Sequence, residues 1–145
     1  MVGGLPGSRW YAEGMNVLAA IVAAVSSFLL GGLWYSKAVF VRPWARAWGL
    51  DPDQPPKNPK HPASVFGVSF VFALIAAVVF AWWLGPNPPL GYALGRGLAA
   101  GAGIAATSFG INYQFANKSP VLWLIDGGYH TAQFLLYGLI LGVWH

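Results

Sequence analysis

Residues 125–144, IDGGYHTAQFLLYGLILGVW, decide the fold class of this chain. They form an apolar run with a single charged residue, Asp126, and with His130 one helical turn further on. A helix crosses the hydrocarbon core of a bilayer in about 20 residues. A carboxylate inside such a span costs at least about 2.5 kcal/mol, so it normally has a partner or a function. The stretch therefore predicts a membrane-spanning helix with a polar pair inside it.

The composition of the whole chain is that of a membrane protein. Hydrophobic residues make up 57% of its 145 residues, against about 45–50% in soluble domains. The length allows one domain, residues 1–145. The absence of cysteine excludes disulfides and thiolate sites. Lipid headgroups explain the net charge of +4 better than nucleic acid does, because the few basic residues gather mostly in one loop.

Four apolar runs without an internal proline alternate with polar or proline-rich joints. They cover residues 15–35, 63–84, 97–115 and 121–144. Each is long enough to cross a bilayer, and short joints make consecutive helices antiparallel. We therefore predict an all-α membrane protein, a four-transmembrane-helix bundle with up-down-up-down topology.

The first joint is the longest, and its front half predicts a short interfacial helix. This half is AVFVRPWARAWGL, residues 38–50. Pro43 suits the first helical position and Gly49 suits the end of the helix. Trp44 and Trp48 share one helical face, as expected for a helix that lies in the headgroup layer.

Basic residues predict the orientation in the membrane. The back half of the first joint, DPDQPPKNPKHP at residues 51–62, has five prolines and predicts an extended, polyproline-like loop. The first joint and the third together hold Lys37, Arg42, Arg46, Lys57, Lys60 and Lys118. The opposite side holds Arg9 and Arg96. Because basic loops stay in the cytoplasm, we predict a multi-pass protein of the bacterial inner membrane with the 51–62 loop cytoplasmic and both termini outside, on the periplasmic side.

Small residues are dense on the runs, and small residues let helices in lipid approach closely. Examples are Gly97, Gly101 and Ala105 in the third run and Gly138 and Gly142 in the fourth. Such faces either pack the helices of one bundle or dock a second copy or a larger complex. Four short helices cannot shield all of them, so we expect a homo-oligomer or a larger membrane complex as partner, besides the lipid bilayer.

The polar groups of the fourth run share one helical face, at spacings of three and four residues. The predicted intramembrane polar cluster consists of Asp126, His130, Gln133 and Tyr137 on this face, of Asn112 and Tyr113 at the end of the third run, and of Trp34 and Tyr35 at the end of the first. Its carboxylate would accept a hydrogen bond from Asn112, Tyr113 or Tyr35. It would also hold the imidazole of His130 in one tautomer.

Three functions compete for this cluster. The first is an interhelical clamp, with about 0.6–2 kcal/mol per hydrogen bond, in a non-catalytic accessory or scaffold subunit. The second is a proton-coupled carrier of a small solute or cation, in which Asp126 and His130 exchange charge. The third is a haem or chlorophyll-type pigment bound through His130, the only mid-membrane candidate ligand.

We predict the clamp, without a cofactor, a metal site or catalytic residues. Motifs of hydrolases, zinc proteases and phosphate-binding loops are not present in the sequence.

Two segments resemble a known family. The first is MNVLAAIVAAVSSFLLGGLWYSKAVFVRPWARAWGL, and the second is INYQFANKSPVLWLIDGGYHTAQFLLYGLILGVW. The positions that carry the resemblance are Asn16, Gly32, Trp34, Tyr35, Ser36, Phe40 and Trp44 in the first, and the Asn112–Tyr113 pair with Asp126, Tyr129 and His130 in the second. The chain resembles the family of small bacterial membrane proteins called domain of unknown function 1761. The resemblance implies a four-helix membrane fold and no established activity. The proline-rich stretch 51–62 departs from the family pattern, which implies a more helical segment there.

Overall fold

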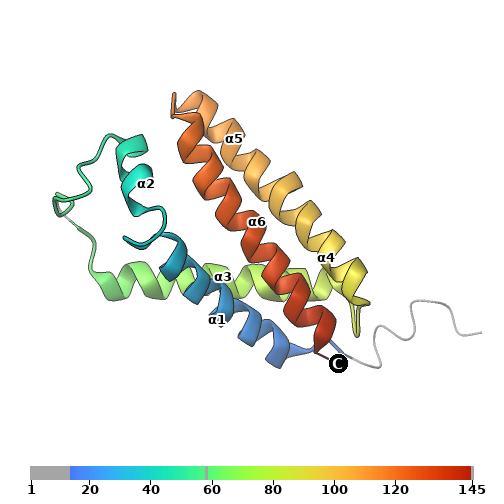
Figure 1. Ribbon diagram of the computed structural model, residues 1–145. Coiled ribbons are helices and arrows are strands. Elements are labelled where there is room, and N and C mark those ends of the chain that lie inside the picture. Colours follow the sequence, from blue (N-terminus) through green and yellow to red (C-terminus); the bar gives the residue numbers. More distant parts are fainter. Residues whose placement is uncertain (1–13, 58, 145) are drawn as a thin grey trace, which may run out of the picture.

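The computed structural model describes residues 14–57 and 59–144, and within them every regular element is a helix (Figure 1). The elements are α1 (Val17–Trp34), α2 (Val41–Trp48), α3 (Pro62–Leu84), α4 (Leu90–Leu98), the π-helical segment η1 (Ala99–Ala105), α5 (Ala106–Phe115) and α6 (Pro120–Val143). The all-α class is therefore confirmed. Arg9, which counted toward the predicted orientation, lies outside the described residues.

The central element is α6, which contacts every other helix. The α4–η1–α5 rod packs along one side of it, and α1 and α2 pack on another (Figure 1). The remaining helix, α3, packs mainly on α1 and meets α6 through its C-terminal half, where Phe80 contacts the ring of Tyr137 with centroids 6.3 Å apart. This arrangement places the polar face of α6 against several partner helices at once.

Side-chain caps and prolines set the start of the long helices. The Oδ1 atom of Asn16 accepts a hydrogen bond from the Ala19 N–H at 2.9 Å, and Ser119 caps α6 in the same way. The first predicted run, 15–35, and the fourth, 121–144, lie within two residues of α1 and α6. In α2, Gly49 ends the helix in a left-handed conformation with φ of 77°, as predicted. Pro43 is the third residue of α2, because the helix begins at Val41.

The third helical rod begins earlier than predicted. The sequence placed a turn up to Arg96, whereas α4 begins at Leu90, directly after two prolines, and runs through η1 into α5 without a break in helical backbone angles. Arg96 lies in the last turn of α4, and its guanidinium lies 5.3 Å from the ring centroid of Trp83 and 5.0 Å from that of Tyr92. Cation–π contacts of this kind stabilise a charged group beside apolar surface.

Glycines let the α4–η1 rod pack directly against the backbone of α6. A Cβ atom at Gly101 would lie 2.6 Å from the Cα of Thr131, and one at Gly138 would lie 2.5 Å from the carbonyl oxygen of Ala93. A Cβ at Gly97 would overlap the carbonyl oxygen of Phe134. These small residues therefore serve contacts inside the bundle.

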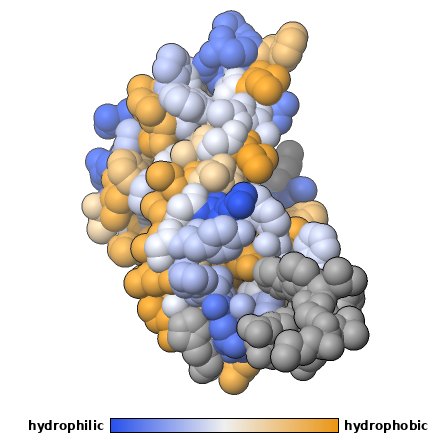
Figure 2. Space-filling view, turned by 90° about the vertical axis from the view of Figure 1, so that its right-hand side faces the viewer, coloured by the Kyte–Doolittle hydropathy of each residue, from blue (hydrophilic) through white to orange (hydrophobic). Residues whose placement is uncertain are grey.

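Two helices, α1 and α3, are long and apolar enough to cross a membrane by length and composition. Only 28% and 17% of their apolar windows are buried inside the chain, whereas the core helix of a soluble protein is mostly buried. Figure 2 shows apolar side chains, in orange, along much of the left-hand edge of one face. An exposed apolar surface of this extent indicates association with a membrane.

Candidate functional site

The carboxylate of Asp126 and the hydroxyl of Tyr137 make the most side-chain hydrogen bonds in the described structure, three each. Asp126 lies on α6, is only 7% exposed, and accepts three hydrogen bonds. Its Oδ1 accepts from the Tyr35 hydroxyl at 2.6 Å and from the Trp44 Nε1 at 3.1 Å. Its Oδ2 accepts from the Tyr113 hydroxyl at 2.6 Å. We call these four residues the carboxylate clamp, since the donors belong to the end of α1, to α2 and to α5.

All three donors of the carboxylate clamp are neutral aromatic side chains. Both tyrosine bonds have the length of charge-assisted O–H···O hydrogen bonds, about 2.5–2.7 Å. Within the described residues, no basic side chain forms an ion pair with Asp126. The acceptor charge is thus stabilised by hydrogen-bond donors supplied by three separate segments, and each bond ties one segment to α6.

The rings of the donors also pack against one another. Tyr35 and Trp44 lie with ring centroids 5.9 Å apart, Trp44 and Trp48 at 6.1 Å, and Trp48 and Tyr113 at 6.2 Å, all edge to face. Such pairs contribute about 0.5–1.5 kcal/mol each beyond their area burial. The aromatic contacts therefore hold the donors in place around the carboxylate.

Sequence reasoning did not include Trp44 among the candidate site residues. The predicted interfacial helix had its tryptophans in the headgroup layer, but α2 turns this face toward α6. The shared face of Trp44 and Trp48 was the signal in the sequence. The missing information was which side of the bundle that face would meet.

His130 does not bond to Asp126, so the prediction that the carboxylate holds the imidazole is wrong. The Nδ1 of His130 lies 2.7 Å from the Oε1 of Gln133, one turn toward the C-terminus. Gln133 donates from Nε2 to the Tyr137 hydroxyl at 2.7 Å, and this hydroxyl donates to the carbonyl of Ala73 on α3 at 3.0 Å. We call His130, Gln133 and Tyr137 the histidine chain. It ties α6 to α3, as a second polar contact separate from the first.

The π-helical segment η1 decides which residue of α5 reaches Asp126. A π turn holds one residue more than an α turn. An uninterrupted α-helix would follow Gly101 with Ala105 and Asn112 on the side that faces α6. With the extra residue, Ala106 and Tyr113 lie there instead, and both are buried. Asn112 is exposed, so its prediction as a donor is wrong for this reason.

Two indoles bind backbone carbonyls beside the clamp. Trp34, which the sequence placed in the cluster, donates from Nε1 to the Ile125 carbonyl at 3.1 Å. Trp123 donates to the Ala106 carbonyl at 2.7 Å, directly after the π segment. These bonds join α1 and α5 to the same turn of α6 that carries Asp126.

The comparison with known families agrees with this picture. A family model described as "Protein of unknown function (DUF1761)" matches residues 18–142. The chain belongs to this family. The resemblance seen in the two sequence segments is thereby confirmed. Neither a curated protein nor a solved structure gave a significant match.

The matched region of this DUF1761 chain contains the whole carboxylate clamp and the whole histidine chain. It also contains the proline-rich stretch, in which the described residues 51–57 and 59–61 form no helix.

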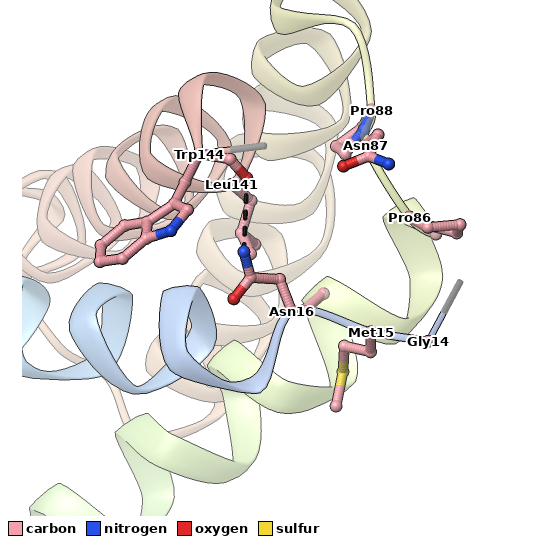
Figure 3. A pocket seen from close by; sticks show the side chains of 10 residues that line it. Gly14, Met15, Asn16, Pro86, Asn87, Pro88, Leu141 and Trp144 are labelled. Carbon is pink, nitrogen blue, oxygen red and sulfur yellow. Dashed lines mark hydrogen bonds between the residues drawn. The ribbon is translucent and has the colours of Figure 1, made fainter. Parts of the chain in front are cut away.

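Asn16 lies just outside the match and closes the opposite end of this DUF1761 bundle. Its Nδ2 reaches the Trp144 carbonyl at 3.5 Å, drawn as a dashed line in Figure 3. The bond borders a cavity of about 230 Å³ where α1 begins and α3 and α6 end. Both polar atoms of the Asn16 amide are thus used in capping α1 and joining it to the end of α6.

Proposed function

We propose that the protein is a non-catalytic, four-span membrane protein in which the carboxylate clamp fixes how the helices pair. In this role it is a small accessory or scaffold subunit of the bacterial inner membrane. The observation that supports this proposal best is that both oxygens of the Asp126 carboxylate are bonded and that together they accept from three different segments. A group that is satisfied in this way stabilises an arrangement of helices.

The same geometry gives less support to a proton-coupled carrier. A carrier that used Asp126 and His130 would need a path for the proton between them and a route to the solute. The carboxylate is buried among aromatic rings, and the imidazole bonds to Gln133 instead. The two groups therefore belong to separate hydrogen-bonded sets.

Asp126→Asn separates the clamp from the carrier. The amide keeps one acceptor oxygen for two donors, and its NH₂ group meets the third donor, so we expect a loss of about 1–2 kcal/mol of stability with the fold retained. We expect no proton flux from the unaltered protein or from Asp126→Asn in liposomes that contain a pH-sensitive dye. A flux in the unaltered protein that disappears in Asp126→Asn would support the carrier and contradict the clamp. Asp53→Asn, at a side chain 71% exposed, is the matched control.

The four-span topology rests on the apolar outer faces of α1 and α3 and on the position of the joints. The joint that follows α3 lies at the opposite end of the bundle from the proline-rich stretch and the α5–α6 turn (Figure 1). The first and third joints, at the proline-rich end, hold more basic residues than the opposite end, and this excess favours a cytoplasmic position for them.

The cysteine-free sequence allows a direct test of this topology. Gly91 is exposed with open space at its Cβ position, and Gln54 is exposed in the first joint. In intact cells, we expect a membrane-impermeant maleimide to label Gly91→Cys. Gln54→Cys should react only after the membrane is permeabilised. The reverse pattern would invert the orientation, and labelling of both sites in intact cells would contradict the four-span topology.

Outward-facing glycines support the proposal that the protein is part of a larger complex. Added Cβ atoms at Gly67 on α3 and at Gly103 on η1 would contact nothing within 4 Å. In lipid, such positions permit close approach of another helix. The proposed partner is a second copy of the chain or a larger membrane complex, to be measured as the mass of particles extracted in mild detergent.

A further inference from the structure

A groove of about 830 Å³ opens between α3 and α6. It is lined by the C-terminal half of α1, the N-terminal half of α3 and the middle of α6. It exists because α3 meets α6 through its middle and C-terminal half and diverges from it toward its own N-terminus (Figure 1). The carboxylate clamp and the histidine chain, which hold the bundle, leave this space unfilled.

The groove combines apolar walls with a few polar groups. Four phenylalanines line it together with His130, Gln133 and three hydroxyl-bearing side chains. These residues are Phe28, Phe66, Phe72, Phe134, His130, Gln133, Tyr35, Ser69 and Tyr129. No Lys, Arg, Asp or Glu is among the described residues that line it. Apolar walls with a few convergent polar groups are typical of small-molecule sites, and the lack of charge favours an uncharged ligand.

The histidine chain determines what His130 offers to a ligand. Gln133 uses its NH₂ group as donor to Tyr137, so its Oε1 accepts from the Nδ1–H of His130. Neutral imidazole then carries a lone pair on Nε2. Among the hydrogen bonds of the described residues, none involves this Nε2. His130 therefore presents an acceptor, and a ligand that matches it brings a donor such as a hydroxyl group.

The size of the groove is that of a ligand pocket. Its volume of about 830 Å³ falls in the range of about 300–1,000 Å³ that is usual for ligand pockets. Its volume thus fits one small amphipathic molecule.

The depth of His130 separates such a molecule from a phospholipid headgroup. His130 is the eleventh of the 24 residues of α6, and it lies near the bilayer midplane if the four-span topology proposed above holds. A charged headgroup is expensive at this depth, whereas a single hydroxyl that donates to an acceptor is tolerated. We propose that the groove binds an uncharged lipophilic molecule whose hydroxyl group donates to Nε2 of His130, the class that includes long-chain alcohols and isoprenoid quinols.

Photolabelling of the full-length protein in nanodiscs tests this proposal. The probe is hexadecanol with a diazirine in its chain, compared with the matching diazirine hexadecane and hexadecanoic acid. We expect the alcohol to label the groove-lining peptides of α3 and α6 about five- to tenfold more than the alkane, the effect of one hydrogen bond to an otherwise unpaired acceptor. Unlabelled hexadecanol should compete.

A matched pair of variants locates the site. Gly32 lines the groove and Gly95 does not, and an added Cβ meets nothing within 4 Å at either position. Gly32→Phe should reduce labelling by the alcohol about tenfold by filling the space, while Gly95→Phe should leave it unchanged. His130→Phe keeps a ring against Phe109 and should remove the preference for the alcohol over the alkane.

Several outcomes would overturn the proposal. These are equal labelling by alcohol and alkane in the unaltered protein, no effect of Gly32→Phe, strongest labelling by the acid, or cross-links that place a second chain in the groove. Maleimide labelling of Gly91→Cys and Gln54→Cys reports the topology independently. A protein that passes the topology test and fails the photolabelling test would refute the lipophile site while leaving the proposed function in place.

Discussion

Asp126→Leu is expected to lower the free energy of unfolding by about 3 kcal/mol or more. Leucine shares the γ-branched shape of aspartate and is larger, so the substitution removes the acceptor without leaving a cavity. Three buried or half-buried donors, from Tyr35, Trp44 and Tyr113, then lose their partner. Each unsatisfied buried donor costs about 1–3 kcal/mol. Denaturation in mixed micelles, followed by helical circular dichroism, measures the loss.

The control for this substitution is Asp53→Leu. Asp53 also pairs with a donor, Arg42 at 3.4 Å, but both side chains are more than half exposed. An exposed pair of this kind contributes about 0–1 kcal/mol. An equal loss of stability in the two variants would show that the acceptor at Asp126 contributes no more than a surface charge.

Gly97→Ala is expected to destabilise the protein by about 2 kcal/mol, although alanine is the better helix former. The added methyl would overlap the backbone carbonyl of Phe134, so α4 and α6 would have to move apart. Overpacking of this type typically costs about 1–3 kcal/mol.

Two residues away, Gly95→Ala should stabilise the protein. Gly95 is exposed and its Cβ position is open, so the gain in helix propensity, up to about 1 kcal/mol, should remain. Both variants are compared in the same denaturation assay. Similar stability of the two would contradict the close contact between the backbones of α4 and α6.

Sequence reasoning placed the polar side chains of α6 on one helical face. Spacings of three and four residues fix which side chains share a helical face, independently of the partners. The spacing does not choose among the partners. His130 lies one turn from both Asp126 and Gln133, and the choice follows from the three donors that already occupy the carboxylate.

The helical face of α5 and the docking of α2 on α6 could not be predicted from the sequence. The π segment shifts the face of α5 by one residue, from Asn112 to Tyr113, and no single residue type marks such a turn. The docking of α2 on α6 likewise depends on a contact between segments 82 residues apart, through Trp44 and Asp126. The divergence of α3 that opens the groove is a property of helix packing, which periodicity does not encode.

A double-mutant cycle between Asp126 and Tyr113 tests the central claim, that the carboxylate clamp holds separate helices together. The cycle compares Asp126→Leu, Tyr113→Phe and the double variant with the unaltered protein in the same denaturation assay. We predict a coupling free energy of about 1–2 kcal/mol across the 2.6 Å hydrogen bond. Strictly additive losses, with a coupling below about 0.3 kcal/mol, would contradict the account.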